Sequence, residues 1–295
     1  MFKSLPLPAA QVGLVLMLLG SLLDSSSGLF TRLISADSFT TASGRGFAAF
    51  GFLLLIMAFR DGRVIFGKLA GIGPYGWAFV ALNGIGMVLN VLSLRYTAVA
   101  NFFMIFATAP FAAGLLGWVV LKERLDGATI MAALAGFAGI AIMMLGGARS
   151  GGLVGDLMAI GCVFTYSCIV LIARRAPRFD LLPVVTLTCL MSGLLTLPFA
   201  NFGAVSLPDG LMLAAFGSIQ LAIGNLLIFA AASRIPPAQS GLLGVFNAGF
   251  APLWVFLALG EVPPQATLIG GALVMAAAIG HLIYTLSPRR ALPGA

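Results

Sequence analysis

Two stretches of the sequence share one pattern, GWVVLKERLDGATIMAALAGFAGI (117–140) and VFLALGEVPPQATLIGGALVMAAA (255–278), and this repeat determines the predicted architecture. A shift of 138 positions sets Glu123 on Glu261 and extends outward to Gly86 on Gly224. A slightly larger shift sets LMLLGSLLDSSSGLF (16–30) against MAIGCVFTYSCIVL (158–171). Both glutamates close an apolar run, so the pattern predicts an internal duplication.

The composition around these stretches requires a lipid environment. Of the 295 residues, 60% are hydrophobic and 8% are charged, and the mean hydropathy is +1.09. Soluble domains carry about 25% charged residues, so a soluble enzyme, a secreted disulfide-rich domain and a disordered chain are excluded. Cys162, Cys168 and Cys189 lie inside apolar runs without metal-site spacing, and we expect them to be small buried hydrophobic side chains.

Ten apolar runs are long enough to cross a bilayer as helices, because about 20 residues span ~30 Å of hydrocarbon. The loops that remain are too short to hold a soluble domain. The first run is longer than the apolar part of a signal peptide, and we expect it to stay as the first helix. The runs cover 4–23, about 38–59, 69–94, 96–121, 127–148, 157–173, 181–208, 210–233, 235–260 and 262–288.

Each half of the duplication then holds five helices, with the first repeat over 1–148 and the second over 149–295. Because five is odd, the second repeat enters the membrane upside down relative to the first. The predicted fold is therefore an all-α integral membrane protein, with ten transmembrane helices as two inverted five-helix repeats around a central cavity. This construction is typical of secondary transporters, which bind substrate near the midplane.

The basic residues predict that both termini lie in the cytoplasm, because cytoplasmic loops carry the excess of Lys and Arg. With ten helices and an inner N-terminus, the outer loops contain Arg32, Arg95 and Arg149. The inner segments contain Lys3, Arg60, Arg63, Lys68, Lys122, Arg124, Arg174, Arg175, Arg178, Arg234, Arg289 and Arg290.

The segment RYTAVANFFMIFATAPFAAGLLGWVVLKERL (95–125) resembles the fourth helix and the glutamate-bearing loop of the EamA-type drug/metabolite transporter (DMT) superfamily. Arg45 is similarly placed to an arginine that this family often has in its second helix. The second half matches through LLGVFNAGFAPLWVFLALGE (242–261), but it lacks the proline at 248 that would repeat Pro110. In overall texture the chain looks most like the bacterial aromatic amino acid exporter branch.

The resemblance implies a carrier of the bacterial inner membrane that moves amino acids or related metabolites out of the cytoplasm. It also implies that helices one, three, four, six, eight and nine line the cavity. We expect no cofactor. The expected partners are a small-molecule substrate and the lipid bilayer, with no nucleic acid and no obligatory protein partner.

Asp24 and Arg45 are the charged residues that need an explanation inside the membrane. Asp24 lies in an apolar run before three serines. It could contact a substrate ammonium, couple transport to protons, pair with Arg45 or simply lie near the outer surface. Arg45 lies seven residues after Ser38, the expected start of helix two, so it could snorkel to the surface or bind a substrate carboxylate.

Uncharged polar side chains near the middle of their runs are the candidate substrate ligands, because amides supply both donors and acceptors. The alternative for each is a hydrogen bond between helices. The set comprises Asn83, Asn90, Asn101, Tyr166, Gln220, Asn225 and Asn247. We expect Trp77, Trp118 and Trp254 in the interfacial belt, and Glu123 and Glu261 as caps or gating residues at the ends of their runs.

Other activities lack the residues they need. The chain has one histidine, which excludes a metal site rich in histidine. It has no phosphate-binding loop, so this chain cannot itself use ATP hydrolysis to drive transport. We expect a secondary transporter and not an enzyme, exporting aromatic or other neutral amino acids by alternating access. The alternatives are a uniporter, an exporter of cationic or aromatic drugs or of other small metabolites and, less favoured, a channel or an intramembrane enzyme.

Overall fold

The structure is a computed structural model that describes residues 9–122, 126–150, 152–175, 180–232, 234 and 242–286. No strand occurs among these residues, so the predicted all-α class is confirmed. Nine of the described helical segments are long and apolar enough to span a membrane, and Phe246–Leu259 is a shorter apolar helix. Glu123, expected at the end of a run, lies outside the described residues.

Some of the expected runs are not single helices, and nine short elements lie between or within the long ones in the described part of the chain. The long helices are α1 (Ala9–Ser25), α3 (Ser38–Asp61), α5 (Gly73–Tyr96), α7 (Ala109–Leu121), α8 (Gly127–Ser150), α9 (Leu153–Arg175), α10 (Leu181–Thr196), α13 (Leu242–Leu259) and α14 (Gln265–Leu286). Shorter helices complete the first, fourth and eighth passes: α2 (Ser27–Leu33), α6 (Val99–Phe106), α11 (Leu207–Ala215), the π-helix η4 (Phe216–Ile223) and α12 (Gly224–Ala232). The connections hold η1 (Gly62–Val64), α4 (Ile65–Ala70), η2 (Leu197–Phe199) and η3 (Phe202–Ala204).

Local sequence explains where several helices begin. Asp37 caps α3, because its Oδ1 accepts the backbone N–H groups of Phe39 and Thr40 at 2.9 Å each. The fourth pass breaks at Ala107 and Thr108, and Pro110 lies in the first turn of α7. Proline fits there because the first helical N–H groups have no partner within the helix.

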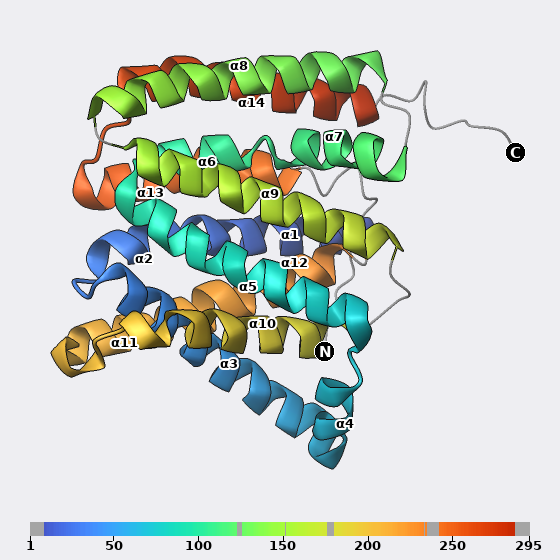
Figure 1. Ribbon diagram of the computed structural model, residues 1–295, viewed down its shortest axis with the longest axis vertical. Coiled ribbons are helices and arrows are strands. Elements are labelled where there is room, and N and C mark those ends of the chain that lie inside the picture. Colours follow the sequence, from blue (N-terminus) through green and yellow to red (C-terminus); the bar gives the residue numbers. More distant parts are fainter. Residues whose placement is uncertain are drawn as a thin grey trace, which may run out of the picture.

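The contacts between helices occur in equivalent pairs, as a two-fold axis between inverted repeats requires. The first pass (α1) contacts α12 and α13 of passes eight and nine, and the sixth pass (α9) contacts α5 and α6–α7 of passes three and four. Equivalent passes contact each other directly, as α3 does α10, α6 does α13 and α8 does α14. Figure 1 shows α8 and α14 side by side along one edge of the bundle, with α1 and α12 near its centre.

The α8–α14 contact depends on glycine. A Cβ atom on Gly139 would lie 2.5 Å from the carbonyl oxygen of Gly270, and one on Gly270 would lie 2.4 Å from that of Gly139. The two backbones therefore approach as closely as small residues allow, which is how helices pack where lipid removes the hydrophobic driving force. Large apolar side chains such as Phe59, which is 84% exposed, cover the outside of the bundle, as expected of a surface that contacts lipid.

Candidate functional site

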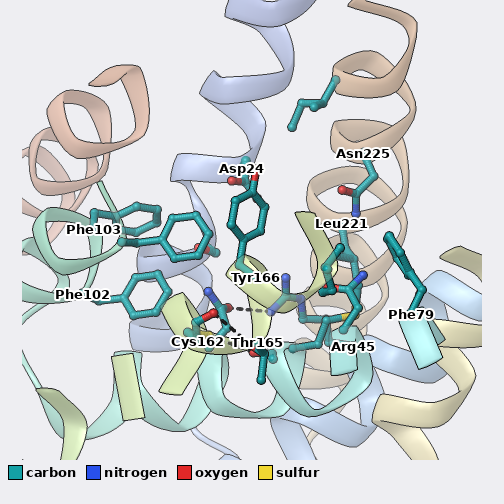
Figure 2. A pocket seen from close by; sticks show the side chains of 18 of the residues that line it. Asp24, Arg45, Phe79, Phe102, Phe103, Cys162, Thr165, Tyr166, Leu221 and Asn225 are labelled. Atoms are coloured by element: carbon teal, nitrogen blue, oxygen red, sulfur yellow. Dashed lines mark hydrogen bonds between the residues drawn. The ribbon is translucent and has the colours of Figure 1, made fainter. Parts of the chain in front are cut away.

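A cavity of about 230 Å³ lies among α1, α2, α3, α5, α6, α9, η4 and α12. Helices of both repeats therefore line it, as a site between repeats requires. The cavity extends from Asp24 and Asn90 towards the end of the bundle at which α5 begins, where Phe79, Ile169 and Phe229 lie. Its further lining residues are Ser27, Arg45, Asn83, Gly86, Met87, Phe102, Phe103, Phe106, Cys162, Thr165, Tyr166, Leu221, Asn225 and Ile228 (Figure 2).

Asp24 lies where the first pass breaks. Ser25 and Ser26 donate their hydroxyls to backbone carbonyls three residues back, and α2 restarts after this turn. The Asp24 carboxylate accepts two amide N–H groups, from Gln220 Nε2 at 3.2 Å and from Asn247 Nδ2 at 2.7 Å. Both amides are buried, and their own carbonyl oxygens have no partner among the described residues. Asp24 is thus a cavity carboxylate held in place from behind by neutral donors.

Arg45 lies inside the bundle and does not snorkel, because its exposed fraction is 5%. Its Nη1 donates to Asn90 Oδ1 at 3.0 Å, and its guanidinium carbon lies 4.5 Å from the centre of the Phe216 ring. The backbones of α3 and η4 approach closely beside Phe216, since a Cβ on Gly217 would lie 2.5 Å from the Arg45 carbonyl oxygen. The buried Nε of Arg45 has no acceptor among the described residues. Arg45 makes no ion pair with Asp24, so the predicted charge pair is not a direct contact.

An aromatic wall from two helices closes one side of the cavity. The Phe102 ring packs edge-on against Phe103 at 5.1 Å and stacks on Phe106 at 5.8 Å, measured between ring centres. Phe106 in turn contacts Tyr166 of α9 edge-on at 5.4 Å. Figure 2 shows Phe102 and Phe103 on the opposite side of the view from Phe79 and Asn225. The cavity therefore combines two opposite charges with a mostly apolar surface.

The end of the bundle near Glu261 is closed by a second set of polar contacts. Arg32 pairs with Glu261 through Nε at 3.0 Å and Nη2 at 3.4 Å, and Nη2 also donates to the Thr97 carbonyl at 2.9 Å. The Val99 backbone N–H donates to Glu261 at 3.4 Å. Arg95 donates to the backbone carbonyl of Thr31 in α2 and to those of Ile34 and Ala36 in the connection that follows α2. We call the Arg32–Glu261 pair the latch.

Beneath the latch lies a buried carboxylate that the sequence reading missed. Asp156 is fully buried, and its Oδ1 accepts the Thr97 hydroxyl at 2.6 Å and Asn101 Nδ2 at 3.1 Å. Asn101 Oδ1 accepts the hydroxyl of Thr267. In the sequence Asp156 only marks the boundary of an apolar run, so its burial leaves no pattern that could have been recognised.

Comparison with known proteins identifies the family. The EamA-like transporter family model matches residues 11–145 and again 153–283, which is one match in each half of the chain. The chain belongs to the EamA-like transporter family. The drug/metabolite transporter resemblance and the two repeats are therefore confirmed, and at the level of the family the protein is a membrane transporter of small molecules and not an enzyme.

Other comparisons add the fold alone. A solved structure, described only as a crystal structure of a protein, superposes on this EamA-like chain with a TM-score of 0.64 and 20% identity. The match covers 95% of this chain and 98% of the other. No curated protein matches the chain. Neither result distinguishes the aromatic amino acid exporter branch from other EamA-like transporters.

The candidate ligands of this EamA-like transporter fall into three groups. Gln220 and Asn247 lie behind Asp24 and do not line the cavity, and Asn101 lies away from it beside Asp156. The residues that do line it are Asp24, Arg45, Asn83, Asn90, Tyr166 and Asn225. Within the described part of the chain, no group of three or more His, Cys, Asp or Glu side chains could hold a metal ion.

Proposed function

We propose that this EamA-like transporter is a secondary carrier that exports neutral amino acids with aromatic or other large apolar side chains. The observation that carries the proposal is the pairing of unmet hydrogen-bonding needs in one cavity. Acceptor sites are in excess on the Asp24 carboxylate, which lines the cavity and accepts one N–H group each from Gln220 and Asn247 behind it. A donor is in excess on Arg45, whose Nε lacks an acceptor in the described part of the chain.

A zwitterion meets both needs at once. An ammonium group supplies three N–H donors to the Asp24 region, and a carboxylate accepts from a guanidinium in the strong, charge-assisted manner. Since Asp24 and Arg45 have opposite charges and do not pair directly, each is left to interact with the oppositely charged group of one substrate. A substrate with a single charge would leave one of the two without compensation inside the membrane, which is costly.

The rest of the cavity favours an apolar side chain of modest size. Phe102, Phe103, Phe106 and Tyr166 offer ring faces and edges to an aromatic group. The volume of about 230 Å³ is below the ~300–1,000 Å³ usual for sites that hold drug-sized ligands. Size and charge together support a metabolite such as an aromatic amino acid over a bulky cationic drug.

We further propose that the latch end faces outwards in a bacterial inner membrane, with both termini in the cytoplasm and the chain divided at 148/149. Arg60 and Lys68 lie at the other end, beside Asp61 and Asp180. Arg32 is held by internal contacts, so its place at the latch end reflects structure and does not weaken the positive-inside argument. With this orientation the cavity extends towards the cytoplasm, where an exporter collects its substrate.

The test is counterflow in proteoliposomes loaded with one unlabelled amino acid and exposed to a labelled one, using the wild type and Asp24→Asn. We expect saturable exchange of phenylalanine, tyrosine, tryptophan or leucine by the wild type and a loss of at least tenfold in apparent affinity in Asp24→Asn, since a charge-assisted contact is removed. The substrate proposal is wrong if no amino acid exchanges.

Two imposed pH gradients then decide the mode of transport. Uptake that is driven by the gradient in the wild type and not in Asp24→Asn makes Asp24 the coupling residue of a proton exchanger. Exchange that ignores the gradient in both proteins makes the carrier a uniporter. Saturable exchange of aromatic amines alone indicates a drug exporter, and flux without saturation or counterflow indicates a channel.

A further inference from the structure

The first pass is joined to α13 by three polar contacts that run from the cavity to the latch. Asn247 donates to Asp24 at 2.7 Å, Trp254 Nε1 donates to Ser25 Oγ at 3.1 Å, and Glu261, just beyond the end of α13, pairs with Arg32 at 3.0 Å. α13 packs along both α1 and α2. Trp254, which the sequence pattern predicts to lie in the interfacial belt, thus directs its indole N–H to the first pass.

The break in the first pass lies inside this row of contacts. Asp24 and Ser25 end α1, Ser26 forms the turn, and Arg32 lies on the separate helix α2. A short helix that follows a serine-rich turn can change its angle without unfolding the longer helix before it. The contact at Asp24 is thus on one side of a pivot and the latch is on the other, with α13 bridging both.

We propose that Asn247 and Trp254 are positioning residues, which connect occupancy of Asp24 to opening of the latch. A substrate ammonium competes with Asn247 for the Asp24 carboxylate. Once Asn247 is displaced, Trp254 and Glu261 are the polar contacts that remain between α13 and the first pass among the described residues. The pair α1–α2 and α13 then separate more easily, and the latch end opens. The inference rests on the proposed function for the identity of the ligand, but the contacts themselves do not depend on it.

Gln220 provides the matched control. It donates to the same carboxylate from the π-helix η4 of the eighth pass, at 3.2 Å, and it is buried as deeply as Asn247. Loss of either amide removes one donor from Asp24. Only loss of Asn247 also removes a contact between the first pass and the helix that leads to Glu261.

The experiment measures access to the cavity from the latch end. The reporter is Ser27→Cys, a cavity-lining position between Asp24 and the latch, in a protein whose three native cysteines are replaced by alanine. A membrane-impermeant maleimide is applied from each side, first without substrate and then with phenylalanine. Counterflow of each variant gives its KM and maximal rate, and thermal unfolding in detergent shows which variants fold.

Without substrate, we expect Glu261→Gln and Asn247→Leu each to raise the labelling rate from the latch end about tenfold, because each removes a contact that holds this end closed. Trp254→Phe keeps the ring and loses only the donor, so a rise of about threefold is expected. Gln220→Leu should raise KM and leave labelling from the latch end within twofold of the parent protein.

Two results would overturn the proposal. One is equal labelling of Asn247→Leu and Gln220→Leu, which would make both amides simple supports of Asp24. The other is unchanged labelling of Glu261→Gln and Trp254→Phe, which are the milder variants if Asn247→Leu does not fold. Phenylalanine should raise labelling of the parent protein, and an absent response together with the expected variant effects would refute the substrate and leave the latch intact.

Discussion

Replacement of Arg45 by glutamine tests whether the buried guanidinium recognises the substrate carboxylate. Arg45 donates to Asn90 at 3.0 Å and faces the Phe216 ring at 4.5 Å, and its Nε has no acceptor in the part of the chain that the structure describes. A hydrogen bond that involves a charged group contributes about 1.5–3 kcal/mol. Loss of the contact with the carboxylate should therefore raise KM for an exported amino acid roughly 10- to 100-fold.

The specific signature is a difference between two substrates. Phenylalanine has the carboxylate, and phenethylamine has the same ring and ammonium without it. In competition counterflow, Arg45→Gln should lose most of its affinity for phenylalanine while its weaker affinity for phenethylamine changes less than threefold. In Arg45→Gln, the ratio of the inhibition constant for phenethylamine to that for phenylalanine should therefore fall towards the value expected of a cavity that does not recognise the carboxylate.

Arg95→Gln is the matched control. The Arg95 guanidinium donates to the carbonyl oxygens of Thr31, Ile34 and Ala36 at 2.8–3.2 Å, and it does not line the cavity. Its loss should lower thermal stability without changing the ratio between phenylalanine and phenethylamine. If Arg45→Gln weakens both substrates equally, Arg45 supports the fold of the cavity through Asn90 and Phe216 and does not bind the carboxylate.

Two further predictions concern the fold. Gly139→Val places a Cβ 2.5 Å from the Gly270 carbonyl oxygen and should lower the unfolding free energy by about 1–3 kcal/mol, measured by thermal unfolding. Gly51→Ala is the control and should be neutral in the same assay, because a Cβ there meets nothing within 4 Å. Equal losses of stability in the two variants would show that the α8–α14 crossing is not tight. Asp37→Ala should cost about 0.5–1 kcal/mol at pH 7, the lower part of the range for a cap because Asp37 is exposed. Burial raises the pKa of Asp37. Hydrogen bonds from the Thr40 hydroxyl and from backbone N–H groups lower it by more than burial raises it, so the pKa lies below its ordinary 3.8. The stabilisation is therefore fully present above about pH 4 and is lost as the pH falls through the depressed pKa. The wild type and Asp37→Ala should converge in stability at low pH. A difference in stability that widens at low pH would contradict the role of Asp37 as a cap.

The transmembrane passes could be predicted because lipid imposes a length of about 20 apolar residues on each helix. The same physics pointed to Asp24 and Arg45, since charge inside an apolar run is rare. The latch could not be predicted, because Arg32 and Glu261 are 229 residues apart and each looks like an ordinary charge at the end of a run. The π-helix that aims Gln220 at Asp24 leaves no trace in apolar periodicity over so short a segment.

The positions that differ between the repeats have consequences for the carrier as a whole. If both repeats had the same residues, the two end states of an inverted-repeat carrier would have equal free energy. The 138-position shift sets Gln220 on Leu82 and Asn247 on Ala109, so both donors to Asp24 come from the second repeat and their counterparts are apolar. A midplane amide contact joins α13 to the first pass in this state, whereas its equivalent between the fourth and sixth passes has no amide at Ala109. This difference favours the state in which the latch end is closed when no substrate is bound, and an exporter that rests with its cavity extending towards the cytoplasm is ready for the next substrate.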